Sequence, residues 1–118
     1  MNSYKDLIVW QKSIQLVKEV YKTTGSFPAN EVYGLTSQIR RSAVSIPSNI
    51  AEGFARKNVG EYRQFLCVAF GSGAELETQL LISMELGYLK QEDYSQIQSL
   101  LTEVMKMLNT MLKNLRKG

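Results

Sequence analysis

The chain has 118 residues, of which 44% are hydrophobic and 21% charged, and its formal net charge is +3. This length allows one domain with a sizeable core, and this composition excludes disordered and collagen-like chains. The absence of histidine removes the commonest general base and the commonest metal ligand, so we expect neither an enzyme nor a metal site, and no cofactor. No signal peptide or uninterrupted apolar run of membrane-spanning length is visible, so we expect a cytoplasmic protein without membrane contact.

Hydrophobic periodicity and helix-terminating residues predict four helices, over residues 4–24, 30–55, 59–87 and 91–116. The connections between them are short, and short connections force consecutive helices to lie antiparallel. We therefore predict an all-α fold, an antiparallel up-down four-helix bundle that forms a single domain over residues 1–118.

The first predicted helix carries two apolar lines. The stronger line has alternating spacings of three and four residues and predicts the core stripe: Leu7, Trp10, Ile14, Val17 and Tyr21. A weaker line lies at least about a third of a turn away and consists of Val9, Leu16 and Val20. A lone bundle would leave this second line in water.

The second predicted helix has an apolar side and a polar side. Its core line consists of Leu35, Ile39, Ala43, Ile46, Ile50 and Phe54. The opposite line is polar and consists of Arg41, Ser45, Asn49, Glu52 and Arg56. This polar line is either a solvated outer face or a buried network, and Pro47 predicts a kink between its ends.

The third predicted helix is apolar on two sides, one of which includes Phe70, so both sides need cover. Gly71 and Gly73 weaken an isolated helix, which predicts close approach by a neighbouring helix. Cys67 lies between apolar neighbours and is expected to be a buried small side chain. Ser72 and Glu75 form a polar row beside the core, where a buried carboxylate would need a cation.

Arg41 of the second helix is the candidate partner of Glu75. A structural network of Arg41, Ser45, Asn49, Glu52, Ser72 and Glu75 would then join the second helix to the third. If Arg41 is buried in this pair, its replacement by alanine should cost roughly 2 to 4 kcal/mol.

Charge is unevenly distributed along the chain. The stretch from Glu75 to Asp93 is acidic, whereas residues 103–118 and the region around Arg56 are basic. The fourth predicted helix begins with acids and ends with bases, as the helix dipole favours. No base-reading motif is present, so nucleic acid would be contacted through its phosphates and shape.

Several motifs resemble one family. They are Asp6-Leu7-x-x-Trp10, Phe27-Pro28-x-x-Glu31-x-x-Gly34-Leu35, the continuous run from Gln38 to Gly53, and Gly71-Ser72-x-x-Glu75-Leu76-x-Thr78. Over residues 4–89 the chain resembles the four-helix-bundle family of 23S ribosomal-RNA intervening-sequence proteins, the S23-type proteins. It is also similar to the accessory variability protein of diversity-generating retroelements.

The resemblance implies a four-helix bundle that assembles into a homopentameric ring with a basic surface that contacts nucleic acid. It gives the second apolar line of the first helix a use in subunit contacts, made by Val9, Leu16, Val20 and Phe70. Together with the segregated charge, it suggests binding of structured RNA or duplex DNA. The candidate binding residues are Arg40, Arg56, Lys57, Arg63, Lys113, Arg116 and Lys117.

Two other functions fit the same sequence. In one, the oligomer is a scaffold whose basic face receives an acidic protein partner, such as a nucleic-acid polymerase. In the other, Arg41, Glu52 and Glu75 form an enzyme site, although a structural role explains that cluster more simply.

Overall fold

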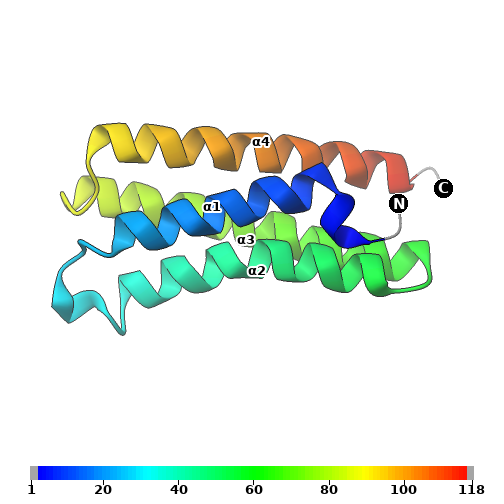
Figure 1. Ribbon diagram of the computed structural model, residues 1–118, viewed down its shortest axis with the longest axis horizontal. Coiled ribbons are helices and arrows are strands. Elements are labelled where there is room, and N and C mark those ends of the chain that lie inside the picture. The colour runs from blue at the N-terminus through cyan, green and yellow to red at the C-terminus, as the bar shows by residue number, and fades with distance from the viewer. Residues whose placement is uncertain (1–2, 117–118) are drawn as a thin grey trace.

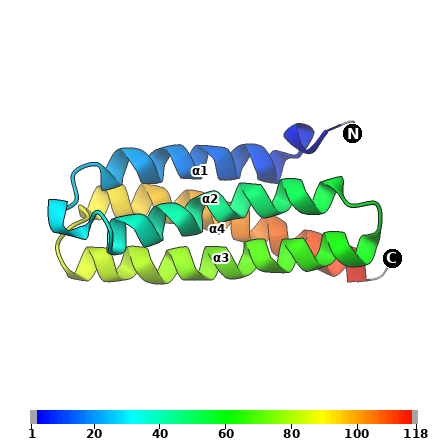
Figure 2. The same ribbon diagram turned by 90° about the horizontal axis from the view of Figure 1, so that it is seen from below.

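The computed structural model describes residues 3–116. Its elements are the short 3-10 helices η1 (Tyr4–Asp6) and η2 (Ala29–Glu31) and the helices α1 (Ile8–Thr24), α2 (Leu35–Ala55), α3 (Val59–Glu85) and α4 (Gln91–Arg116). The four long helices run up and down in a bundle of 45 × 23 × 21 Å (Figure 1). Helices α1 and α3 lie at opposite edges, with α2 and α4 between them (Figure 2). The predicted all-α four-helix bundle is therefore confirmed.

The starts of α1 and α2 differ from the predicted ones because a short 3-10 helix precedes each of them. The Ser3 side chain accepts from the Lys5 amide at 3.1 Å, so it caps η1, and α1 begins four residues later than predicted. Pro28 precedes η2, and α2 begins at Leu35, five residues later than predicted, where the Leu35 amide donates to the Glu31 carboxylate at 3.1 Å. Helix α3 ends at Glu85, two residues early, and α2 continues through Pro47.

The core consists of aliphatic side chains from all four helices. The largest fully buried side chains of α2, α3 and α4 are Ile39, Ile46, Ile50, Leu66, Leu76, Leu80, Ile97, Leu101 and Leu108. Burial of such side chains stabilises the fold by about 25 cal/mol per Å² of apolar surface. The central positions of the predicted core line of α2 are confirmed.

The orientation of α1 is the main correction to the sequence analysis. Val9, Leu16 and Val20 are 3%, 0% and 0% exposed, so they form the core line, and their assignment to subunit contacts is wrong. The predicted core line is displaced by one residue, about 100° around the helix. Its members Trp10, Ile14 and Val17 are half-buried, and Tyr21 is exposed.

Two buried hydroxyl groups make the inner line of α1 look partly polar in the sequence. Ser13 and Thr24 complete this line at 0% and 3% exposure. Ser13 Oγ donates to the Trp10 carbonyl at 2.7 Å, and Thr24 Oγ1 donates to the Val20 carbonyl at 2.7 Å. Because these hydroxyls bond to carbonyls of their own helix, the hydrogen bonds offset the cost of removing them from water.

Two glycines permit close helix contacts and one does not. A Cβ atom at Gly73 would collide with Met105 of α4, so the predicted close approach is confirmed there. At Gly53, a Cβ atom would lie 2.8 Å from Phe65 Cβ of α3. At Gly71 no neighbouring atom of the described residues lies within 4 Å of a Cβ position, so the predicted close approach is not made there.

The outer face of α3 remains largely uncovered. Cys67 is exposed, which contradicts its predicted burial, because Leu66 and Ala69 face the core and turn Cys67 outward. Phe70 is half-buried and packs partly against the core, and its assignment to subunit contacts stays a prediction. By length and composition α3 could also cross a membrane, but core helices of bundles meet the same criteria, and about a third of this stretch is buried.

The bundle end that carries the α1–α2 and α3–α4 connections is joined by one polar contact. Tyr88 Oη donates to Glu31 Oε2 at 3.0 Å, and the Tyr88 ring lies 5.6 Å from that of Phe27. The hydrogen bond to the Glu31 carboxylate, then desolvation and the Glu31 charge, raise the pKa of the Tyr88 phenol above its ordinary value of 10.0. Burial likewise raises the pKa of Tyr62.

The close contact at Gly53 predicts opposite effects of the same substitution at two glycines. Gly53→Ala should lower the free energy of unfolding by about 1 to 2 kcal/mol, because the new methyl group meets the α3 backbone and Phe65. Gly60→Ala adds the same methyl group at an exposed position of α3 and should raise it by up to about 1 kcal/mol. Urea denaturation of both variants tests this, and equal effects would contradict the contact.

The raised tyrosine pKa values predict a loss of stability in alkali. The folded state holds these phenolic protons more tightly than the unfolded state, so their contribution is complete below pH 10 and is lost as the pH rises above it. Tyr88→Phe should show a smaller fall in Tm between pH 9 and pH 11 than the unmodified chain. If the Tm values of the two proteins fell by the same amount over this range, the Tyr88–Glu31 contact would not contribute to the loss of stability in alkali.

Candidate nucleic-acid interface

The antiparallel topology gathers basic residues at one end of the bundle. The start of α1, the α2–α3 turn and the end of α4 all lie at this end (Figures 1 and 2). The half that contains it, residues 3–16, 46–72 and 104–116, carries eight basic and three acidic residues. The other half, residues 17–45 and 73–103, carries five basic and eight acidic residues. We call the first of these two ends the basic end.

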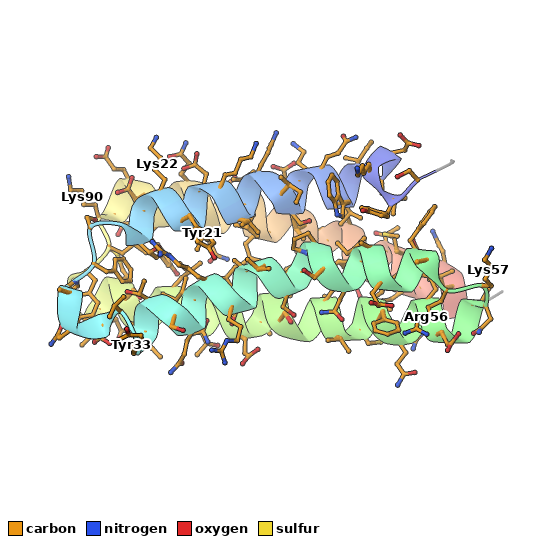
Figure 3. All side chains as sticks on the ribbon, turned by 60° about the horizontal axis from the view of Figure 1, so that its bottom comes forward. Tyr21, Lys22, Tyr33, Arg56, Lys57 and Lys90 are labelled. Carbon is orange, nitrogen blue, oxygen red and sulfur yellow. The ribbon has the colours of Figure 1, made fainter. Side chains whose placement is uncertain are left out.

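Two lysines at the basic end are available to a ligand. Lys57 lies in the turn between α2 and α3, and Lys113 lies in the last turns of α4. Both side chains are exposed, and neither forms an ion pair within the described residues. Figure 3 shows Lys57 beside Arg56 at this end, with Lys22 and Lys90 at the opposite end.

Arg56 belongs to the fold as much as to the surface. Its guanidinium pairs with Glu52 at 3.2 Å and with Glu61 at 4.0 Å, and it stacks over the Phe65 ring at 5.0 Å. These contacts link the end of α2 to the start of α3, where Asn58 caps the new helix by accepting from the Glu61 amide. Two carboxylates balance the Arg56 charge, so this residue contributes little to the net positive charge of the basic end.

Arg63 is only partly free. Its side chain is half-buried, and its Nη1 donates to Cys67 Sγ at 3.7 Å across one turn of α3. The Arg63 Nε atom is buried and has no hydrogen-bond partner in the described part of the chain. A phosphate that approaches the outer nitrogens would therefore meet a guanidinium whose orientation is fixed by α3.

Arg40 does not lie with the other predicted binding residues. Its Nε donates to Thr24 Oγ1 at 2.9 Å, its Nη2 donates to the Tyr21 carbonyl at 3.4 Å, and its guanidinium lies 4.5 Å from the centre of the Tyr21 ring. These contacts tie α2 to the C-terminal end of α1, in the half of the bundle opposite the basic end. We therefore correct its assignment from ligand binding to a structural contact.

The remaining predicted binding residues lie at the C-terminal limit of the described residues. Arg116 ends α4, but its side chain lies outside the described residues, as does Lys117. The sequence analysis missed Lys5 and Lys106, which are exposed in the same half as Lys57. A sum of charges by bundle end, rather than along the chain, would have found them, because the predicted antiparallel order already places these segments together.

The predicted polar network is confirmed in its centre. The hydroxyls of Ser45 and Ser72 hydrogen-bond at 2.7 Å and join α2 to α3. Asn49 Nδ2 donates to both the carbonyl and the hydroxyl of Ser45, at 2.8 and 2.9 Å. Small hydroxyl groups at this crossing satisfy each other while the two helices pack closely.

The charged part of the predicted network is wrong. Arg41 and Glu75 are both exposed, and no ion pair or hydrogen bond joins them in the described part of the chain. Glu52 pairs with Arg56 instead. The basis for a cost of 2 to 4 kcal/mol on removal of Arg41 is therefore absent, since water already solvates that charge. The proposed enzyme cluster of Arg41, Glu52 and Glu75 likewise shows no mutual contact within residues 3–115.

Among the described residues, no three His, Cys, Asp or Glu side chains lie close enough to hold a metal ion. The chemistry that the basic end itself offers is the attraction of anions by exposed ammonium groups.

Comparison with known proteins supports the fold and the family. The family model described as "23S rRNA-intervening sequence protein" matches residues 5–110. A crystal structure at 1.70 Å of a protein of unknown function from the S23 ribosomal protein family, from Bacteroides thetaiotaomicron VPI-5482, superposes with a TM-score of 0.81. The two chains are 26% identical over 90% of this chain and 99% of that chain. None of the curated proteins compared with the chain matches it.

The contacts of Arg40 predict a structural effect of its replacement. Arg40→Ala should lower the free energy of unfolding by about 1 to 2 kcal/mol, because it removes the stacking on Tyr21 and the hydrogen bond to Thr24. Arg40→Lys should restore little of this stability, since the lysine ammonium group cannot stack on Tyr21 and hydrogen-bond Thr24 as the planar guanidinium does. Lys22→Ala, at an exposed position of α1, should change the free energy of unfolding by less than about 0.5 kcal/mol. Thermal unfolding of the three variants would refute the structural role if Arg40→Ala resembled Lys22→Ala.

Proposed function

The chain belongs to the 23S rRNA-intervening sequence protein family, and we propose that it is a non-catalytic, cytoplasmic, homo-oligomeric protein that binds structured RNA or duplex DNA. The binding surface in this proposal is the basic end. The matched family model concerns proteins named for insertions in ribosomal RNA genes, which fits an RNA ligand without identifying one. A pentameric ring is the assembly that the sequence resemblance suggests.

The observation that carries the proposal is the separation of charge between the two ends of the bundle. Eight basic residues against three acidic ones occupy the half with the α2–α3 turn. Two exposed members that form no ion pair among the described residues come from separate segments, Lys57 from the turn and Lys113 from α4. Their ammonium groups would replace counterions on several phosphates of a nucleic acid.

The proposed contact is with the backbone of the nucleic acid rather than with its bases. Lysine ammonium groups on flexible stems act as point charges and do not present the planar fork that reads guanine. The arginine best placed for base reading, Arg56, is held by Glu52, Glu61 and the Phe65 ring. We therefore expect little sequence preference and a strong dependence on salt.

Oligomerisation would convert a modest charge into a strong one. One chain has a net charge of +3, too small for tight binding by itself at physiological salt. In a ring, several copies of the basic end would face the same ligand and act together. This gain requires the basic ends to lie on one side of the ring, which an arrangement of copies around a single rotation axis provides.

The test is a salt titration of the oligomer against a labelled structured RNA and a matched DNA duplex. The logarithm of the binding constant should fall linearly with the logarithm of salt concentration. The double variant Lys57→Glu/Lys113→Glu should weaken binding and lower the slope by about 2 for each chain in contact with a duplex, because about 0.9 is lost per phosphate contact. The matched control Lys22→Glu/Lys90→Glu makes the same charge change at the opposite end (Figure 3) and should bind more tightly than the first variant.

Equal weakening by the two double variants would contradict the basic end as the binding surface. No binding of the unmodified oligomer to either nucleic acid at physiological salt would contradict the proposed function. That outcome would favour the scaffold alternative, in which the same lysines receive an acidic protein surface.

A further inference from the structure

The outer face of α3 combines features that the single chain does not use. Along one line of this helix, with spacings of three and four residues, lie Val68, Gly71, Glu75, Thr78, Ile82 and Glu85, all exposed. We call this line the α3 ridge. Val68 is 48% exposed and Ile82 is 44% exposed, and the adjacent Leu81 is 47% exposed. Exposed aliphatic side chains grouped on one helix face, with charged residues between them, are a feature of interaction surfaces.

Gly71 sets the shape of the ridge. It lies in the interior of α3, where glycine weakens a helix relative to alanine. At Gly53 and Gly73 a Cβ atom would meet a neighbouring helix, whereas among residues 3–116 no neighbouring atom lies within 4 Å of a Cβ position at Gly71. The ridge thus has a low point between Val68 and Glu75, which permits the close approach of another backbone.

A complementary surface lies on another side of the same chain, along the seam between α1 and α2. Its floor is the apolar line that α1 turns away from the core, with Trp10, Ile14 and Val17. These residues and Val44 line a hollow of about 290 Å³. At Val44 it continues into a second hollow of about 390 Å³ beside Tyr21 and Arg41. We call this continuous surface the α1–α2 groove.

The charges of the two surfaces are opposite. The groove lining contains Arg40 and Arg41 and no acidic residue, whereas the α3 ridge contains Glu75 and Glu85 and no basic residue. Among the residues that the structure describes, no carboxylate pairs with Arg41 and no cation pairs with Glu75 or Glu85. Both surfaces thus combine apolar side chains with charges that the chain itself leaves unneutralised.

We propose that the α3 ridge of one copy docks in the α1–α2 groove of the next copy. This inference rests on the proposed homo-oligomeric state and names the surfaces that form it. Because the ridge and the groove are different surfaces, the contact is heterologous, and each copy keeps a second surface free for another neighbour. Repetition of the contact around one axis closes a ring and directs every basic end to the same side.

The test uses two variants, each of which disables one of the two surfaces. All substituted positions are exposed, so the fold of the single chain should tolerate the changes. Gly71→Lys fills the low point of the ridge, and lysine is a better helix former than glycine, so the fold should be retained. Arg41→Glu/Val44→Glu reverses the charge of the groove at two exposed positions. Asn109→Lys, at an exposed position of α4, adds the same charge as Gly71→Lys away from both surfaces.

Circular dichroism verifies folding, and sedimentation equilibrium measures mass against the 13.4 kDa of one chain. The unmodified chain and Asn109→Lys should form the same closed oligomer, whereas each surface variant alone should be a monomer. An equimolar mixture of the two surface variants should form a dimer of one copy of each, since one intact ridge then meets one intact groove.

Cys67, the single cysteine of the chain, provides a second measurement beside the ridge. Its alkylation should be severalfold slower in the assembled chain than in Arg41→Glu/Val44→Glu, whose own ridge is unchanged. A monomeric unmodified chain, full assembly of either surface variant, or a mixture that stays monomeric would each overturn the inference.

The outcomes separate this inference from the proposed function. Full assembly of both surface variants, together with salt-dependent binding of nucleic acid, would overturn the ridge–groove contact alone. Assembly through these surfaces without nucleic-acid binding would overturn the proposed ligand and retain the contact.

Discussion

The burial of Leu16 and Val20 of α1 against the other helices determines most of what this molecule presents to its surroundings. With this line inward, at 0% exposure for both residues, the bulkier line with Trp10 is turned to the seam with α2. The buried hydroxyls of Ser13 and Thr24 make this orientation possible, because they bond to carbonyl groups of their own helix. The same rotation places Thr24 and Tyr21 where Arg40 reaches both of them. The groove and the principal polar contact between α1 and α2 therefore have one origin.

Arginine and lysine have different roles in this chain, and the difference follows from their side chains. Arg40 and Arg56 each stack on an aromatic ring and donate to oxygen atoms, which a planar guanidinium can do at the same time. Lys57 and Lys113 have compact, strongly hydrated charges and remain exposed. The arginines thus hold helices together, while the lysines supply the charge of the basic end. A count of basic residues alone does not separate these roles.

Helix α3 leaves several large apolar side chains exposed after folding, namely Val59, Val68, Leu81 and Ile82. Its inner face packs Leu66, Leu76 and Leu80 into the core, and its hydroxyl at Ser72 meets Ser45 of α2. Its outer face gains nothing from the bundle, since Val68 and Ile82 remain nearly half exposed. A helix that is apolar on both sides has more to bury than one chain can cover. The inner face of α3 therefore stabilises the bundle, and its outer face is the surface on which the proposed association depends.

The sequence by itself determined the number, order and approximate bounds of the helices, because periodicity, capping residues and short connections are local properties. It also determined the core line of α2, where one apolar stripe was clearly preferred, and it placed Ser45 and Ser72 in one polar network between α2 and α3 without deciding whether that network was buried. Only the tertiary structure decided which of two neighbouring lines of α1 faces inward, since Ser13 and Thr24 make the true line look polar until their backbone hydrogen bonds are known. It likewise decided that Arg41 stays in water and Arg40 does not, although the two are adjacent. The physical reason is the same in both cases: a displacement of one residue turns a helix position by about 100°, and only contacts with distant segments select between such positions.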